Sequence, residues 1–283
     1  MIQRSAPAKI NLYLHVVGKR ADGYHLLDSL FAFAKSGDIV TVGESDGLSL
    51  TLGGLYGAKL AADADNSVLK AARLLAQYLG VPAKAQIRLE KNLPVASGIG
   101  GGSADAAAAL LALNDLWGKR APMPALREIA LKIGADVPAC LSDKAVFVSG
   151  IGENVEEAPA VPLTPVVLVN PNIALSTPAV FKNRKGDFDK PMRMEAADFA
   201  PENFVKALSL RANGLQNAAI ALVPEIKAVL NALENRPACR LARMSGSGAT
   251  CFGVFKNAGE ADACASVLRE KHPEWWIFPT FLT

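Results

Sequence analysis

The sequence predicts an α+β protein with two domains, and three features indicate this. Apolar and polar side chains alternate along the beginning of the chain, as they do in half-buried strands. A strand-like segment further on runs through a glycine-rich loop into an alanine-rich helix. Beyond Pro159, Pro162 and Pro165, strands and helices follow one another in the mixed order of a two-layer domain. We place the domain boundary at these prolines, which gives an N-terminal domain at 1–158 and a C-terminal domain at 159–283.

The beginning of the chain is predicted to be mostly strand. Residues 8–16 have alternate apolar side chains, which is typical of a strand with one buried face. The polar face of this strand would carry Lys9, Asn11, Tyr13 and His15. After a turn at 18–23, further strand-like segments lie at 29–34, 38–42 and 48–52.

A helix follows, and both of its ends carry a signal. Asn66 or Ser67 can cap its N-terminus, apolar side chains recur at helical spacing, and Gly80 ends it. A strand at 85–90 leads into the glycine-rich loop. The alanine-rich helix then extends to about residue 113, a second amphipathic helix covers 126–133, and a strand lies at 145–149.

The second half is predicted to alternate between strands and helices. We expect a strand at 166–169, a helix that begins at Ser176-Thr177-Pro178, and an irregular charged stretch at 182–198. The remaining elements are helices near Leu215 and Pro224, strands at 240–244 and 250–255, a helix at 260–271 and a strand around Trp276.

The composition excludes several classes of protein. Of 283 residues, 51% are hydrophobic and 20% are charged, which favours a globular protein over a disordered one. The net charge is +3 and the sequence has no block of basic residues, so we expect no nucleic-acid partner. The small positive net charge suits an anionic small molecule. No apolar run reaches membrane-spanning length and the start does not resemble a signal peptide, so we expect no membrane partner and a cytoplasmic location.

The cysteines and histidines do not suggest a metal site. The four cysteines show no paired spacing and only three histidines are present, so a structural zinc site is not expected. We expect buried thiols of a reducing compartment at Cys140, Cys239, Cys251 and Cys264.

The loop at 93–104 is the strongest functional signal in the chain. Four glycines let its backbone approach a bulky anion, and the helix that follows offers unpaired amides and a positive dipole end. These properties predict a polyphosphate ligand. Gly102 is followed by Ser103 and Ala104, so the loop is not a Walker loop, and only a fragment of a dinucleotide fingerprint is present. The competing interpretation is a plain turn between a strand and a helix, which the length of the glycine run disfavours.

Two charged residues are candidates for phosphoryl-transfer chemistry. Asp136 follows a helix-ending glycine and precedes a proline, so a rigid turn would present its carboxylate, and Lys9 lies on the polar face of the first strand. Each also has an ordinary explanation. An aspartate after a glycine is usually a helix cap, and a lysine on a strand face is usually solvated.

Five segments, in chain order, resemble motifs of the GHMP kinases. They are Pro7-Ala8-Lys9-Ile10-Asn11-Leu12, Gly18-Lys19-Arg20-Ala21-Asp22-Gly23-Tyr24-His25, the loop at 93–104, Gly134-Ala135-Asp136-Val137-Pro138 and Met244-Ser245-Gly246-Ser247-Gly248-Ala249-Thr250. The resemblance implies the GHMP kinase fold, a ribosomal-S5-like N-terminal domain followed by a ferredoxin-like C-terminal domain. It also implies transfer of the γ-phosphoryl of ATP, with Mg²⁺, to a hydroxyl of a small molecule. The first two segments point within the family to a cytidine diphosphate sugar-alcohol of the non-mevalonate isoprenoid route.

The same resemblance assigns roles to residues. Asp136 would be the base and Lys9 its cationic neighbour, which could stabilise the forming alkoxide. The residues implied to bind ATP are Pro94, Val95, Ala96, Ser97, Gly98, Ile99, Gly100, Gly101, Gly102, Ser103 and Ala104. Those implied to bind the substrate are Asn11, Tyr24, His25, Phe181, Gly246 and Ser247, with the aromatic rings around cytosine. Protein ligands of the metal and the oligomeric state are not assigned.

Two alternatives stay open at the level of sequence. One is another GHMP small-molecule kinase, of the homoserine or mevalonate type, which should lack the Gly-Tyr-His run beside a stacking Phe181. The other is a nucleotide-binding regulator without catalysis, against which the retained Lys9 and Asp136 argue. The match is looser at 211–216, so the role of Asn213 is left open.

Overall fold

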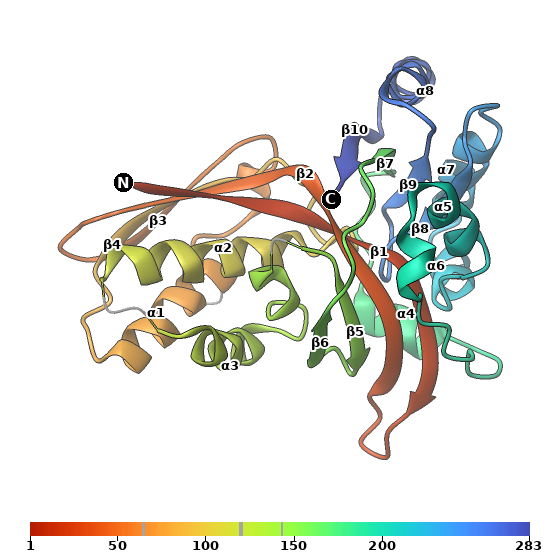
Figure 1. The fold of residues 1–283 in the computed structure, drawn as a ribbon. Coiled ribbons are helices and arrows are strands. Elements are labelled where there is room, and N and C mark those ends of the chain that lie inside the picture. The colour runs from red at the N-terminus through yellow and green to blue at the C-terminus, as the bar shows by residue number, and fades with distance from the viewer. Residues whose placement is uncertain (64–65, 119–120, 143) are drawn as a thin grey trace. The chain divides into compact units, whose positions relative to one another are not determined.

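The computed structural model describes residues 1–63, 66–118, 121–142 and 144–283, and the chain divides into two compact units (Figure 1). Unit 1 consists of Met1–Lys9, Ser36–Val95 and Gly100–Asp143. Unit 2 consists of Ile10–Lys35, Ala96–Ile99 and Lys144–Thr283. Neither unit is one continuous stretch, because the first two strands and the glycine-rich loop contribute residues to both. The predicted boundary between 158 and 159 stays a prediction.

Unit 1 combines strands with a group of helices. It holds the N-terminal part of β1 (Ile2–Lys19), the C-terminal part of β2 (His25–Gly43), β3 (Leu48–Gly53) and β4 (Ala85–Glu90). Strand β4 pairs in parallel with β3 and antiparallel with β2. Helices α1 (Ser67–Leu79), α2 (Gly101–Leu116) and α3 (Met123–Ile133) gather on one side of these strands (Figure 1). Two short 3-10 turns complete the unit, η1 (Gly57–Lys59) and η2 (Ala139–Leu141).

The helix boundaries of unit 1 follow from local signals. The side chain of Asn66 accepts a hydrogen bond from the Val68 amide at 3.0 Å, and Gly80 ends α1 in the left-handed conformation with φ 64°. Both ends confirm the sequence prediction. Helix α2 buries its alanines on almost every side, and their small side chains allow the close packing of α1 against it.

Unit 2 is built on an antiparallel sheet with the strand order β10-β7-β9-β8. Besides the C-terminal part of β1 and the N-terminal part of β2, the unit contains β5 (Val146–Gly150), β6 (Asn154–Glu157), β7 (Thr164–Asn170), β8 (Leu241–Met244), β9 (Cys251–Val254) and β10 (Trp276–Leu282). Its helices are α4 (Thr177–Asn183), η3 (Ala196–Phe199), α5 (Pro201–Ser209), α6 (Gln216–Leu222), α7 (Glu225–Glu234) and α8 (Ala258–Lys271). Strand β5 pairs with the N-terminal part of β2 and with β6.

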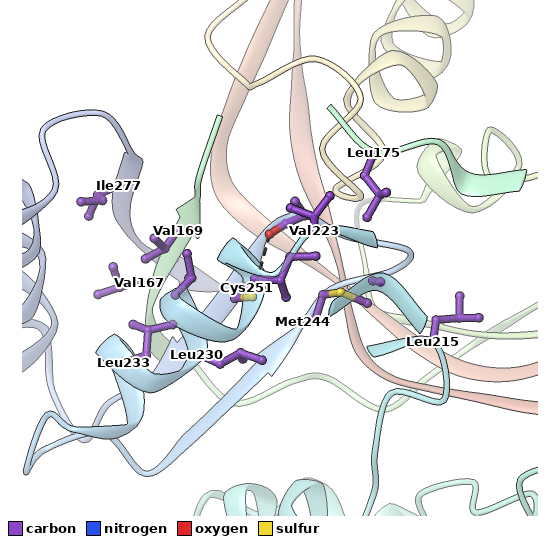
Figure 2. Close-up of a cluster of buried hydrophobic side chains, with 14 of the residues drawn as sticks. Val167, Val169, Leu175, Leu215, Val223, Leu230, Leu233, Met244, Cys251 and Ile277 are labelled. Atoms are coloured by element: carbon purple, nitrogen blue, oxygen red, sulfur yellow. Dashed lines mark hydrogen bonds between the residues drawn. The ribbon is translucent and has the colours of Figure 1, made fainter. Parts of the chain in front are cut away.

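The core of unit 2 lies between this sheet and its helices (Figure 2). Val167 and Val169 of β7 are fully buried in the same cluster as Leu230 and Leu233 of α7. Helix α8 contributes Leu268 to this cluster, which therefore joins strands and helices that are far apart in the chain. Within the described residues, no helix is both long enough and apolar enough to cross a membrane.

The structure differs from the predictions in four places. The segments at 29–34 and 38–42 form one strand, β2, because Gly37 continues the strand where its backbone meets another chain segment: a Cβ there would lie 2.0 Å from the Ala6 oxygen. Helix α5 and strand β6 were not predicted. Helix α5 starts at Pro201, just beyond the stretch predicted to be irregular, and proline is compatible with the first helical position. Cys239 is only half-buried, whereas the other three cysteines are buried.

Candidate active site

Lys9 of β1 and Asp136 form an ion pair within unit 1. The Lys9 Nζ lies 3.1 Å from Asp136 Oδ2. The lysine side chain is only 4% exposed, whereas the aspartate side chain is 38% exposed. The lysine is therefore not the solvated surface residue of the ordinary interpretation, and the carboxylate is the member of the pair that solvent reaches.

The backbone around Asp136 fixes its position. Helix α3 ends at Gly134, and the amide of Val137 donates to the Gly134 oxygen at 3.2 Å. The amide of Cys140 donates to the Asp136 oxygen at 3.3 Å, at the start of η2. A carboxylate on such a hydrogen-bonded turn is held by the backbone on both sides.

The N-terminus of α2 lies against two buried lysines. Gly100, with φ 64°, precedes the helix, and a Cβ at this position would lie 2.8 Å from Lys9 Cε. A Cβ at Gly101 would lie 2.8 Å from Lys91 Nζ. At Gly100 the positive φ also favours glycine, and at Gly101 a side chain would require Lys91 to shift. The first amides of a helix have no partner within it, so this end presents donors and positive potential.

Lys91 belongs to a buried cluster with Asp38 of β2 and Asp105 of α2. Its Nζ donates to Asp38 Oδ2 and to Asp105 Oδ2, the second at 2.7 Å, and none of the three side chains is more than 3% exposed. Burial acts to lower the pKa of Lys91, but the charges and hydrogen bonds of Asp105 and Asp38 outweigh it and raise the pKa. This cluster was not predicted from the sequence. A single charged residue, Asp105, within a run of buried alanines was the available signal.

Within unit 2, a second glycine-containing loop joins β8 and β9. Gly246 and Gly248 have φ 55° and 88°, and Gly98 packs directly on the loop, since a Cβ on Gly98 would lie 2.5 Å from the Gly248 oxygen. The Thr250 amide donates to the Ser97 oxygen at 3.0 Å. The segment Ala96–Ile99 is therefore held by backbone contacts to this loop.

Asn213 holds the same loop through its side chain. Its Nδ2 donates to the oxygens of Met244 at 2.7 Å and Gly246 at 2.9 Å, while its Oδ1 accepts from the Leu215 amide at 2.9 Å. These bonds give Asn213, which the sequence left without a role, a clear structural one. The amide of Asn11 donates to Ser245 Oγ at 3.0 Å, which ties the loop to β1 as well.

Two rings of the predicted substrate site stack on each other within unit 2. The centroids of His25 and Phe181 are 5.0 Å apart and their planes differ by 26°. Tyr24, which precedes His25 in the sequence, is 61% exposed. Burial, followed by the charges of Lys19 and Arg184, lowers the pKa of His25, so its imidazole is neutral at neutral pH.

Comparisons with known proteins identify the family. The family models "GHMP kinases N terminal domain" and "GHMP kinases C terminal" match residues 66–144 and 184–274. A protein of Paramagnetospirillum magneticum named 4-diphosphocytidyl-2-C-methyl-D-erythritol kinase is 50% identical, over 98% of this chain and 97% of its own. A protein of the same name from Ruegeria pomeroyi is 51% identical, over 97% of each chain. The chain belongs to the GHMP kinase family.

Solved structures agree with this membership. A crystal structure of 4-(cytidine 5'-diphospho)-2C-methyl-D-erythritol kinase matches with a TM-score of 0.80 and 33% identity, over 99% of each chain. Homoserine kinase from Cytophaga hutchinsonii matches with a TM-score of 0.70 but 18% identity, over 99% of this chain and 94% of that one, which shows a common fold only. The predictions of the GHMP kinase fold and of an ATP-dependent kinase are confirmed.

In this GHMP kinase, the residues predicted for the site fall into two groups. Within unit 1, Lys9 meets Asp136, and Gly100 lies against Lys9. Within unit 2, His25 meets Phe181, and Ser247 Oγ lies 2.7 Å from the Thr177 hydroxyl of α4, the helix that carries Phe181. The side chain of Asn11 is 2% exposed and donates to Ser29 Oγ at 2.9 Å, so its amide already has an internal partner.

Asn213→Asp is expected to destabilise this kinase by about 1–3 kcal/mol, because two buried carbonyls lose their donor and face a carboxylate. The free energy of unfolding in urea measures the effect. Asn203→Asp is the matched control, since the exposed Asn203 also donates to a backbone oxygen, that of Ala197 at 3.0 Å. An Asn213→Asp protein as stable as the control would contradict the role given to Asn213.

Proposed function

We propose that this chain transfers the γ-phosphoryl of ATP to a hydroxyl of 4-diphosphocytidyl-2-C-methyl-D-erythritol, in the non-mevalonate route to isoprenoid precursors. The observation that carries the proposal is the Lys9–Asp136 ion pair of 3.1 Å, whose lysine packs against Gly100 at the N-terminus of α2. Relatives about 50% identical to this chain carry the name of that kinase.

The phosphates of ATP would bind at the start of α2. Phosphoryl transfer requires positioning and donors for the charge on the phosphate oxygens, and the first amides of a helix supply both. Gly100 and Gly101 support this role because neither position has space for a Cβ, so the ligand would meet bare backbone. We assign the ATP contacts to the segment from Pro94 to Ala104, with Ser103 as an additional hydroxyl donor.

Asp136 would take the proton from the acceptor hydroxyl. Its side chain is 38% exposed, so a substrate oxygen can reach it, and the hydroxyl must lose its proton as it attacks the terminal phosphorus. The ammonium of Lys9 is buried and lies 3.1 Å from this carboxylate, so it would be beside the hydroxyl that the carboxylate receives. From there it would stabilise the negative charge that develops on the hydroxyl oxygen as the proton leaves.

Magnesium would accompany ATP rather than occupy a protein cage. No three His, Cys, Asp or Glu side chains of the described residues come together as metal ligands. A Mg²⁺ ion in a kinase is held largely by phosphate oxygens and water, with one or two protein ligands, so this arrangement fits the ion without a dedicated cluster. When bound, the ion would neutralise phosphate charge.

The cytosine ring would be recognised by the aromatic pair in unit 2. A neutral His25 has one donor and one acceptor nitrogen, which suits the donor and acceptor edge of cytosine. Phe181 offers a face for stacking, and the exposed Tyr24 offers a second one. The rings of His25 and Phe181 stack on each other in this structure, so a base that binds between them would have to separate them. Asn11, Gly246 and Ser247 are the remaining proposed substrate contacts.

His25→Ala is expected to raise KM for the cytidine substrate about tenfold, from the loss of one stacking and hydrogen-bonding side chain, and to leave KM for ATP unchanged. Initial rates with each substrate varied in turn measure both constants. His272→Ala is the control, because His272 also stacks on an aromatic ring, that of Trp275, at 3.7 Å. Equal losses for both substrates would contradict a specific role of His25 in cytosine recognition.

The proposal is tested by ADP release with three acceptors. The purified chain should release ADP with 4-diphosphocytidyl-2-C-methyl-D-erythritol and not with mevalonate or homoserine. Turnover with either of the other two would support another GHMP kinase, and nucleotide binding without turnover would support a regulator.

We also propose a cytoplasmic location, which the four free cysteines support.

A further inference from the structure

The Asp38–Lys91–Asp105 cluster has a charge imbalance that its packing does not resolve. Two carboxylates surround one ammonium, so the cluster would carry one net negative charge if all three groups were ionised. A buried charge without a partner is costly, and such groups usually change their protonation state instead. The cluster touches Gly101, where the nucleotide phosphates are proposed to bind, so its charge is important for the site.

The hydrogen bonds of the two aspartates are unequal. Asp38 Oδ1 accepts from the amides of Asn92 at 2.5 Å and Leu93 at 2.8 Å, and its Oδ2 accepts from Lys91. Asp105 accepts from Lys91 through Oδ2 alone, and its Oδ1 is buried with no hydrogen-bond partner among the described residues. Both oxygens of Asp38 thus act as acceptors, and Asp105 is the carboxyl group better suited to carry a proton.

We infer that Asp38 and Asp105 hold one proton between them, mainly on Asp105, so that with Lys91 they form a neutral unit that positions the first turn of α2 for the triphosphate. The inference rests on the proposed function and extends it to residues not previously assigned to the site. Lys91 and the two aspartates act through the helix end rather than on the reacting atoms, so they are positioning residues.

The surroundings of Asp105 favour the neutral form. Burial and the charge of Asp38 raise the pKa of Asp105 to about 8, although the charge of Lys91 opposes them. From η2, the thiol of Cys140 is close enough to be affected by the Asp105 charge, and burial raises the pKa of this thiol to about 12, so it stays neutral below pH 9. Helices α1 and α3 pack on α2 with apolar buried residues.

Raising the pH should therefore weaken ATP binding. When the shared proton leaves, one net negative charge appears beside Gly101 and repels the phosphates. A charge at this depth is poorly screened by salt, so we expect the Kd for ATP to rise about tenfold between pH 7 and pH 9. A phosphate monoester loses its last proton near pH 6, so the nucleotide itself changes little in this window.

Calorimetric titration of ATP at pH 7, 8 and 9 tests the inference on four proteins. Asp105→Asn and Asp38→Asn each leave one carboxylate beside Lys91, so each should bind ATP with a Kd that is independent of pH. Asp115→Asn is the control on the same helix, because Asp115 is a partly exposed partner of Arg4, and it should keep the wild-type dependence. Thermal unfolding of each protein establishes that it is folded at each pH.

The outcomes separate this inference from the proposed function. A wild-type Kd that does not change with pH, or variants that lose affinity at high pH as the wild type does, would overturn the inference even if ADP release proceeds normally. Absence of ATP binding at every pH would overturn both. In the wild type, KM for ATP should depend on pH while kcat stays unchanged, and this dependence should disappear in Asp105→Asn. That result would support positioning of the nucleotide and not a general loss of structure.

Discussion

Replacing Asp136 with Asn is expected to lower kcat by about a hundred- to ten-thousand-fold while ATP still binds. The amide has nearly the same shape as the carboxylate, so the turn at 134–138 and its hydrogen bonds should remain. It cannot accept the proton of the acceptor hydroxyl, and that proton must leave as the oxygen attacks. ADP release at saturating concentrations of both substrates measures kcat, and calorimetry measures ATP binding.

The control for Asp136→Asn is Asp115→Asn, which removes an equally paired carboxylate from the surface of unit 1. This control should retain wild-type kcat. If Asp136→Asn turned over at nearly the wild-type rate, Asp136 would not be the base. If it lost ATP affinity and kept kcat, the residue would belong to nucleotide binding instead.

The second large effect is expected for Lys9→Met, which should lower kcat by about a hundred- to a thousand-fold, as loss of one preorganised donor to a developing negative charge does. Methionine has a similar length and is tolerated in a buried position, so it fills the space against Gly100 while the ammonium is lost. The rate of ADP release against the concentration of each substrate separates kcat from KM.

Lys144→Met is the matched control for Lys9→Met, because Lys144 also pairs with a carboxylate, Glu157 at 2.6 Å, but is 62% exposed. It should leave both constants unchanged. A rise in KM for ATP with kcat intact in Lys9→Met would assign the lysine to phosphate binding, contrary to its proposed role beside the base.

Much of the fold was predictable where local signals are strong. Helix α1 begins after the cap at Asn66 and ends at the left-handed Gly80, as predicted. Strand β4 has the predicted limits, 85–90. The prediction failed where tertiary contact overrides local preference. Separate strands were predicted at 29–34 and 38–42, but Gly37 continues β2 between them, where the backbone of Ala6 packs against it.

The site was predictable only in part, for a related reason. The glycine-rich loop is a local pattern, whereas the pairing of Lys9 with Asp136 joins residues more than a hundred positions apart and was expected only through the family resemblance. The cluster of Asp38, Lys91 and Asp105 had no such guide, because the three charges lie in separate segments of the chain. Only the packing of β2 and α2 around Lys91 brings them together.

The two glycines at the start of α2 have a consequence for inhibitor design. A compound that rests on the backbone of Gly100 and Gly101 touches positions where even a methyl group would collide with a lysine held in place by its carboxylate partners. An alanine at either position would require the lysine beside it to move, and at Gly100 the left-handed φ of 64° adds strain, so a resistance mutation here would disturb the site itself.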